Sequence, residues 1–329
     1  MREAIFHAEL GDDVFGEDPT TNRLEKMAAE RMGKEAAIMV ASGTMGNLVC
    51  VLSHCKRGEE AILGDQSHTF LYEAGGMSTV GGIHPHTIAN QPDGTMRLED
   101  IEGAIRGSNL HFPRSRLICL ESTHNRCYGS PLKPDYMETV AKLAGDRGIR
   151  VHLDGARIFN AAVSLGVDAK ELTRHADSVS FCLSKGLSSP VGSVICGSGE
   201  FIAEARRNRK VLGGGMRQSG IIAAAGIESL EHMVDRLAED HENARRLAEG
   251  IAGTPGLSID LNRVQTNIVY IDIADNGLTA EELVKQLADR GIKILQVAPK
   301  RLRAVTHYGI SAGDIDLALT ALNEVMARP

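Results

Sequence analysis

Short apolar runs alternate with helix-length segments through the first two thirds of the chain. The runs are rich in Val, Ile and Leu, as expected of strands covered on both faces, and they span residues 36–40, 61–63, 117–120, 151–153, 178–183 and 191–196. Helical segments such as 136–146 lie between several of them. Strands that alternate with helices predict βαβ units, and therefore an α/β fold with a mostly parallel sheet.

The last third of the chain has a different pattern. An apolar stripe at helical spacing predicts one long helix over residues 219–249, and Gly253-Thr254-Pro255-Gly256 then breaks the chain. Strands and helices follow at residues 267–273, 280–290, 292–297, 304–306 and 314–327. Thr279 and Glu282 predict a capping box for the helix at 280–290, and Gly291 suits its end. We therefore expect a large α/β domain at residues 1–240 and a small C-terminal α+β domain at residues 241–329, bridged by the long helix.

Composition narrows the class of protein. A chain of 329 residues is long enough for two domains, and a formal net charge of −7 gives no support to nucleic-acid binding. Six cysteines without a C-x-x-C pair favour buried reduced thiols over a disulfide framework or a zinc site. The sequence shows no secretory signal pattern and no apolar run long enough for a membrane span. We therefore expect a cytoplasmic protein without a metal, a nucleic-acid partner or a membrane partner.

Two of the predicted strands end in reactive side chains. The run at 178–183 leads into Ser184-Lys185-Gly186, and the run at 151–153 leads into Asp154. Ligands of open α/β sheets bind outside the carboxyl ends of the strands. A Lys and an Asp delivered there together indicate a pyridoxal phosphate (PLP) site, in which Lys185 forms the Schiff base and Asp154 keeps the pyridine nitrogen protonated. Taken singly, Lys185 also fits a solvated strand end and Asp154 a helix N-cap.

Further segments fit the same cofactor. Ser42, Gly43 and Thr44 follow the first strand and open a helix, so backbone N–H groups and the positive end of the helix dipole would cradle a phosphate. An ordinary N-cap is the alternative, and the segment matches neither the P-loop nor the Rossmann glycine pattern. His68 and His124 each follow a predicted strand. His68 is placed to stack on a flat ring, although a lone His in a loop often has only a surface or capping role.

Two arginines are candidate anion ligands. Arg217 follows Gly213-Gly214-Gly215, and Arg303 lies beside a predicted strand of the small domain. The planar guanidinium can hold a phosphate or a carboxylate through two hydrogen bonds. A solvated Arg is the alternative at both positions.

Taken together, these segments resemble low-specificity L-threonine aldolases, which are PLP-dependent enzymes of the aspartate aminotransferase (fold type I) superfamily. The resemblance runs in order over essentially the whole chain. It rests on Gly11-Asp12-Asp13-Val14, Gly16-Glu17-Asp18-Pro19-Thr20, Ser42-Gly43-Thr44, Glu73-Ala74-Gly75-Gly76 near His68, Ser122-Thr123-His124-Asn125, Asp154-Gly155-Ala156-Arg157, Leu183-Ser184-Lys185-Gly186-Leu187 and residues 213–218 and 303–307. It implies a large fold type I domain that binds PLP, a small C-terminal domain, and a homotetramer with active sites at a dimer interface.

The resemblance also implies a role for each candidate residue. Lys185 would hold PLP covalently, Asp154 would pair with its ring nitrogen, and His68 would stack on the ring. The phosphate would be held by Ser42, Gly43 and Thr44, with Arg217 reaching it from a neighbouring subunit. The substrate carboxylate would be bound by Arg157, which also borders the cofactor, and by Arg303. His124 would lie near the substrate hydroxyl.

The expected reaction is the cleavage of L-threonine, L-allo-threonine and other β-hydroxy-α-amino acids to glycine and an aldehyde. His124, or else His68, is the candidate to take the hydroxyl proton. A related β-eliminating lyase or an aminotransferase is one alternative. A PLP-binding oligomer without useful activity is another, because the Arg-Ser-Asp-Thr segment usual in the family, whose Ser helps to hold the substrate carboxylate, does not occur in the ten residues before Gly11.

Overall fold

A seven-stranded sheet organises most of the chain in the computed structural model, which describes residues 1–274 and 278–327. Its strands, in spatial order, are β1 (Ala36–Val40), β7 (Ser193–Gly197), β6 (Ser178–Cys182), β5 (Arg150–Asp154), β4 (Ser115–Glu121), β2 (Glu60–Gly64) and β3 (His84–Ile88). From β3 to β6 all neighbours are parallel, and β7 runs antiparallel to both β6 and β1. The six strands predicted for this region and the mostly parallel sheet are confirmed.

Within this sheet, sequence patterning missed the strand β3. It lies at the edge of the sheet, its residues are half-buried or exposed, and Pro85 is one of them. A strand with solvent on one side needs no continuous apolar run, and Pro is tolerated at an edge because its missing N–H is not required there.

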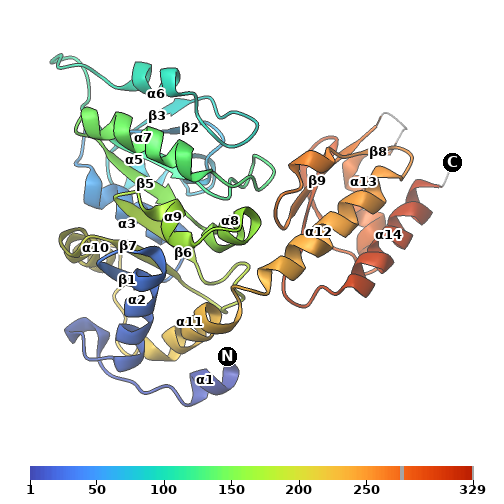
Figure 1. Cartoon of the computed structure of the whole chain (residues 1–329), viewed down its shortest axis with the longest axis horizontal. Helices are drawn as coiled ribbons and strands as arrows, with labels where there is room; N and C mark the ends of the chain where they lie inside the picture. Colours follow the sequence, from blue (N-terminus) through green and yellow to red (C-terminus); the bar gives the residue numbers. More distant parts are fainter. Residues whose placement is uncertain (275–277, 328–329) are drawn as a thin grey trace. The chain divides into compact units, whose positions relative to one another are not determined.

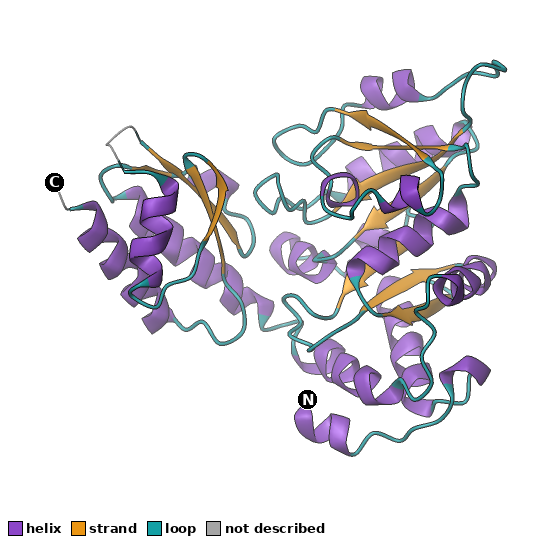
Figure 2. Cartoon of the chain, turned by 180° about the vertical axis from the view of Figure 1, so that it is seen from behind, coloured by secondary structure: helices purple, strands orange, loops and turns teal. Residues whose placement is uncertain are grey.

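Helices cover both faces of this sheet (Figures 1 and 2). They are α1 (Arg2–Phe6), α2 (Pro19–Met32), α3 (Gly43–His54), α4 (His68–Leu71), α5 (Gly76–Thr79), α6 (Leu98–Ala104), α7 (Pro134–Asp146), α8 (Ile158–Leu165), α9 (Ala169–Thr173), α10 (Gly199–Val211) and α11 (Gly220–His232), with the short 3₁₀ helix η1 at Asp13–Phe15. Residues alternate between the faces of β5, so His152 and Asp154 point one way and Val151 and Leu153 the other. Helix α3 packs against β5 and β6 and supplies the Asn47 side chain, which meets both His152 and Asp154.

Helix α2 shows how local sequence sets the boundaries of an element. Asp18 is its N-cap and accepts a 2.8 Å hydrogen bond from the Thr21 N–H, while Pro19 occupies the first helical position. The helix ends at Gly33, whose φ of 61° lies in the left-handed region that favours glycine. Both ends are therefore fixed by residue type, and the apolar face between them carries Leu24, Ala28 and Met32 into the core.

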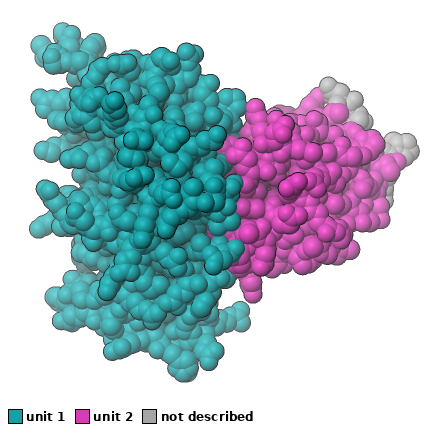
Figure 3. All heavy atoms as spheres, in the orientation of Figure 1, with its two compact units in different colours: residues 1–127, 131–235 teal, residues 128–130, 236–329 magenta. Residues whose placement is uncertain are grey.

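Contacts divide the chain into two compact units, coloured separately in Figure 3. Unit 1 comprises residues 1–127 and 131–235, and unit 2 comprises residues 128–130 and 236–329. The sequence pattern predicts a boundary after residue 240, five residues later than this one.

Unit 2 contains a four-stranded antiparallel sheet with helices packed on it. The strand order is β10 (Leu295–Ala298), β11 (Arg301–Val305), β9 (Ile268–Ile273) and β8 (Leu257–Ser258), and the helices are α12 (Leu237–Ala252), α13 (Ala280–Ala288) and α14 (Ala312–Met326), with η2 at Leu261–Arg263. The predicted capping box is confirmed, since Glu282 N–H donates to Thr279 Oγ1 over 3.2 Å and Thr279 N–H donates to Glu282 Oε2 over 2.9 Å.

The prediction of one long helix over residues 219–249 is wrong. The segment forms two helices, α11 and α12, separated by residues 233–236. Arg236 precedes α12 and pairs with Asp240 (2.8 Å) and Glu239 (3.3 Å) in its first turns. The apolar stripe continues across the break because each half faces a different core: Leu230 is buried in unit 1, whereas Leu247 and Ile251 belong to the apolar core of unit 2.

All six cysteines lie in unit 1, where they are buried and free of disulfide bonds, as predicted. Burial raises the pKa of the Cys55 and Cys127 thiols to about 12. Among the helices of the described residues, none combines the length and the apolar character that crossing a membrane requires.

Candidate active site

The carboxyl ends of the parallel strands open into a cavity of about 280 Å³ in unit 1, which we call the lysine cavity. Six of the predicted site residues line it: Ser42, Gly43, Thr44, His68, Asp154 and Lys185. Asn47, Glu73, Cys182 and Ser184 are also in its wall. Strand ends and one helix start thus bring together residues that lie far apart in the sequence.

The start of α3 forms one wall of the lysine cavity. Ser42 is the N-cap, and its Oγ accepts a 3.2 Å hydrogen bond from the Met45 N–H. A Cβ added at Gly43 would lie 2.8 Å from Cys182 Sγ, so only glycine lets the backbone approach the end of β6 so closely. The ordinary capping role of Ser42 is therefore present, and the first N–H groups of a twelve-residue helix border the same cavity.

Lys185 and Asp154 stand at the ends of neighbouring strands. Lys185 follows β6 in a turn where Ser188 N–H donates to its carbonyl over 2.9 Å, and its side chain is half-buried. Asp154 is the last residue of β5 and only 4% exposed. Its Oδ1 accepts a 3.0 Å hydrogen bond from the Ala156 N–H, and its Oδ2 accepts a 2.8 Å bond from Asn47 Nδ2. The carboxylate is thus held in one orientation at the cavity wall.

His68 is held by two carboxylates. Its backbone N–H donates to Glu121 Oε2 over 2.7 Å, and its Nδ1 lies 2.9 Å from Glu73 Oε1. Because Glu73 can only accept when ionised, the proton of the neutral imidazole is on Nδ1 and Nε2 is left as the basic nitrogen. The hydrogen bond to Glu73 raises the pKa of His68 above its usual value, against the effect of partial burial.

The structure does not bring every predicted residue to the cavity. His124 is 1% exposed, and neither ring nitrogen has a hydrogen-bond partner among the described residues, although Nε2 lies 3.9 Å from Glu121 Oε2. Arg157 is the half-buried N-cap of α8, and Arg217 is exposed. Of these three described residues, none lines the lysine cavity. Arg303 belongs to unit 2, on β11 opposite Tyr270 of β9.

The partners of Arg217 explain its position. Its Nη1 lies 2.6 Å from Asp12 Oδ2, and its guanidinium sits 5.9 Å from the centre of the Phe15 ring. These contacts hold it against the segment around η1, away from the lysine cavity of its own chain.

Comparison with known proteins decides the family. The sequence profile of the beta-eliminating lyases matches residues 1–275. The chain belongs to this family. It is 48% identical over 330 residues to low-specificity L-threonine aldolase 1 of Arabidopsis thaliana, covering 99% of this chain and 92% of that protein. It is 44% identical over 311 residues to the low specificity L-threonine aldolase of Escherichia coli K12, covering 94% and 90%.

A solved structure supports the fold of this beta-eliminating lyase family member. A Leishmania major threonine aldolase matches with a TM-score of 0.83 at 18% identity, over 95% of this chain and 91% of that one. Sequence identity of 18% supports a shared fold but does not establish a shared function. The predicted fold type I architecture and the resemblance to low-specificity L-threonine aldolases are confirmed.

Sequence reasoning gave no role to three polar residues of the site. Asn47, Glu73 and Glu121 are all buried, and each bonds a predicted site residue. Asn47 lies three residues after Thr44, and Glu73 five residues after His68. The available signal for Asn47 was a polar side chain on a helix that packs against two buried strands, where an amide needs partners on the strands.

Among the residues that the structure describes, two clusters of acidic residues and histidine have the spacing to hold a metal ion. Ligand atoms of His68, Glu73 and Asp154 lie within 4.8 Å of one another, as do those of Glu228, Glu231 and His232. In the first cluster the carboxylates already receive hydrogen bonds from the Asn47 amide and the His68 ring. The second cluster is half-buried to exposed, and acidic groups there are well solvated.

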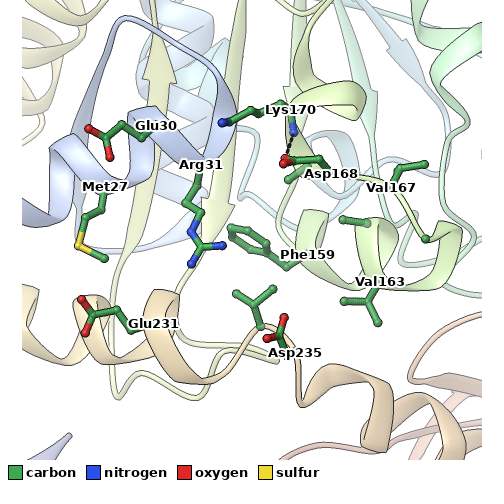
Figure 4. A pocket seen from close by; sticks show the side chains of 14 residues that line it. Met27, Glu30, Arg31, Phe159, Val163, Val167, Asp168, Lys170, Glu231 and Asp235 are labelled. Carbon is green, nitrogen blue, oxygen red and sulfur yellow. Dashed lines mark hydrogen bonds between the residues drawn. The ribbon is translucent and has the colours of Figure 1, made fainter.

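A larger hollow of about 730 Å³, the arginine cavity, lies elsewhere in unit 1 and contains none of the predicted residues. Figure 4 shows Arg31 extending from α2 into it toward Phe159. Arg31 donates a 3.0 Å hydrogen bond to the Leu230 carbonyl. The six charged residues of its wall are all exposed: Glu30, Arg31, Asp168, Lys170, Glu231 and Asp235.

Proposed function

We propose that this chain is a PLP-dependent enzyme that cleaves L-threonine and L-allo-threonine to glycine and acetaldehyde, and other β-hydroxy-α-amino acids to glycine and the matching aldehyde. The observation that carries the proposal is that Lys185, Asp154 and the start of α3 border one cavity. The 44% and 48% identity to L-threonine aldolases over nearly the whole chain selects this reaction among those that the fold supports.

The donor set of the lysine cavity fits PLP. The Lys185 amine suits an aldehyde, the Asp154 carboxylate suits a protonated ring nitrogen, and the first turn of α3 suits a phosphate dianion. Gly43 lies too close to Cys182 for a Cβ, and it lines the cavity at the start of α3. When bound, PLP supplies an electron sink for the pair left on Cα after the Cα–Cβ bond breaks.

Residues of this chain would handle the substrate proton and charge. Cleavage requires a base to take the β-hydroxyl proton as Cβ becomes a carbonyl carbon, and a proton must later return to Cα to give glycine. We assign the first step to His68 Nε2, because His68 lines the cavity and Glu73 fixes its tautomer. His124 is the second candidate, since it is buried without a hydrogen-bond partner among the described residues. Asp154, which accepts two hydrogen bonds, would hold the ring nitrogen in its protonated form.

Binding of the two anionic groups would involve the arginines. Arg157 and Arg303 are proposed to hold the substrate carboxylate, and Arg217 the cofactor phosphate of a neighbouring subunit. The outward position of Arg217, at Asp12 and Phe15, supports a role outside the cavity of its own chain. We therefore also propose a homotetramer with active sites at a dimer interface, acting in the cytoplasm on small amino acids.

The test is product analysis on separate diastereomers. Purified protein with PLP is given L-threonine or L-allo-threonine, and acetaldehyde, glycine, ammonia and keto acids are measured. Acetaldehyde and glycine in equal amounts support the proposal. Ammonia with 2-oxobutanoate would instead show elimination, the reaction that the family's description names, and a keto acid without ammonia would show transamination.

A further inference from the structure

Asn47, in unit 1, has no role in the reaction proposed above. It lies on α3, is 2% exposed, and lines the lysine cavity. One of its Nδ2 hydrogen bonds goes to Asp154 Oδ2 (2.8 Å) and the other to Glu73 Oε1 (2.7 Å). A single amide group therefore joins the carboxylate assigned to the cofactor nitrogen and the carboxylate that orients His68.

The chemistry of its neighbours fixes which way the amide points. Two carboxylates can only accept hydrogen bonds when ionised, so the NH₂ end must face them. The opposite end agrees, because Oδ1 accepts a 2.7 Å hydrogen bond from Ser180 Oγ and lies 3.2 Å from His152 Nε2. A flipped amide would set its carbonyl oxygen against Glu73 and Asp154.

The fixed amide sets the protons of the residues behind it. His152 must carry its proton on Nε2 in order to donate to Asn47 Oδ1, which leaves Nδ1 to accept from Ser178 Oγ at 2.9 Å. Ser178 Oγ then accepts from His54 Nε2 at 2.8 Å. Every donor in this chain of hydrogen bonds points toward the carboxylates, and the groups are buried or half-buried. Such a network has one arrangement rather than several.

We propose that Asn47 is a positioning residue that holds Asp154 and the Glu73–His68 pair in register with each other. The proposal rests on the function proposed above, because Asp154 and His68 matter only if PLP and substrate occupy the lysine cavity. Asn47 would act through these two residues, by donating one hydrogen bond to each carboxylate.

The test compares Asn47→Asp, Asn47→Ala and Asn47→Leu with the matched control Ser53→Ala. Ser53 lies on the same helix and bonds the Val49 carbonyl and Asn208. PLP binding is measured by titrating each apo-protein and following visible absorbance, and kcat and KM are measured with L-allo-threonine. We expect Asn47→Ala and Asn47→Leu to lower kcat roughly 10–100-fold, as loss of a group that orients a ligand does in metal sites, with a smaller change in KM and weaker PLP binding. Ser53→Ala should match wild type.

The order of the variants separates hydrogen bonding from packing. Asp has nearly the volume of Asn, so a packing role predicts that Asn47→Asp is the mildest change. A donor role predicts that it is the most damaging, because an ionised Asp cannot donate and adds a third carboxylate. If Asn47→Asp does not fold, Asn47→Ala and Asn47→Leu decide: wild-type kcat and PLP affinity in either would overturn the proposal. Wild-type protein that neither binds PLP nor cleaves threonine would reject the proposed function and this inference together, whereas active wild type with unaffected variants rejects only the role of Asn47.

Discussion

The lysine cavity and the arginine cavity lie in the same unit and differ in size and in order. The arginine cavity is larger, about 730 Å³ against about 280 Å³, and has a strongly charged wall. Its charged residues are all exposed, whereas Asn47, Glu73 and Asp154 of the lysine cavity are buried. The polar side chains of Asn47, Glu73 and Asp154 are paired with one another or with their neighbours, and pairing fixes their orientation. The orientation of buried groups, rather than volume, therefore marks the site suited to catalysis.

The largest difference between the two cavities is expected when the lysine of each, Lys185 or Lys170, is replaced. Lys185→Ala should abolish measurable threonine cleavage, because the amine that would hold PLP is gone. Borohydride treatment of the PLP-loaded wild type should fix the cofactor on the peptide that contains Lys185 and not in the variant. Lys170→Ala, in the arginine cavity, serves as control and should keep full activity. Cleavage by Lys185→Ala at the wild-type rate would remove the basis of the proposed function.

The next largest effect is expected at the proposed base. His68→Ala should lower kcat by roughly a hundredfold to ten-thousandfold, the usual contribution of a positioned general base. The measurement is steady-state cleavage of L-allo-threonine at saturating PLP. His232→Ala is the control, since that ring is 65% exposed and sits beside Glu231 of the arginine cavity. A His68→Ala variant that retains activity while His124→Ala loses it would move the role to His124.

Burial of imidazoles behind the lysine cavity should appear in the pH dependence of stability. Burial lowers the pKa of His152 to about 4 and that of His54 to about 3. An unfolded His titrates near 6.5 and takes up a proton first, so the stability from a neutral His152 is complete above that pH and is lost as the pH falls toward 4. At pH 5 the loss is about 2 kcal/mol relative to pH 7.5. The measurement is the free energy of urea unfolding at pH 5 and pH 7.5. Wild type should lose about 2 kcal/mol more than His152→Gln between the two pH values. An equal loss in both proteins would contradict the prediction.

A smaller change is predicted for the partner of His68. The hydrogen bond to Glu73 raises the pKa of His68, so the basic form appears only as the pH rises through that raised value. Glu73→Gln removes the negative charge, lowers the pKa and should move the acidic limb of the kcat/KM profile to lower pH. Glu30→Gln, at the arginine cavity, should leave the profile where it is. A limb that moves to higher pH would show that Glu73 does not support the protonated ring.

The smallest effect is expected in the arginine cavity itself. Arg31→Ala removes a 3.0 Å hydrogen bond from an exposed side chain to the Leu230 carbonyl. We expect unfolding free energy to change by no more than roughly 0.5 kcal/mol, as for most surface positions, with kcat and KM unaltered. A loss of cleavage in this variant would contradict the contrast between the two cavities.

The sequence was a good guide wherever a strand end delivers a reactive side chain. Lys185 and Asp154 follow apolar runs, and parallel strands bring such ends to one edge of the sheet, so their convergence in the lysine cavity could be predicted. Asn47 could not be assigned in this way, because its role depends on which residues of β5 and β6 face α3. Pairing of that kind follows from sheet register, which no local pattern contains.

Two features of the fold differ from the sequence prediction for physical reasons. The strand β3 carries Pro85 and half-exposed residues, so it has no apolar run to detect. The break between α11 and α12 interrupts an apolar stripe that serves two cores in succession. Hydrophobic periodicity indicates that a residue faces an apolar core, but it does not indicate which of two cores the residue faces.

The positions of the cysteines allow local unfolding of unit 1 to be measured by thiol alkylation. Every Cys is buried in unit 1, and unit 2 has none. The thiolate of a cysteine attacks an alkylating reagent, and burial blocks the reagent's access to it. The rate of alkylation at each cysteine therefore measures how often the structure around it opens. Cys182, next to Gly43, would report opening at the wall of the lysine cavity. Opening of unit 2 would give no alkylation.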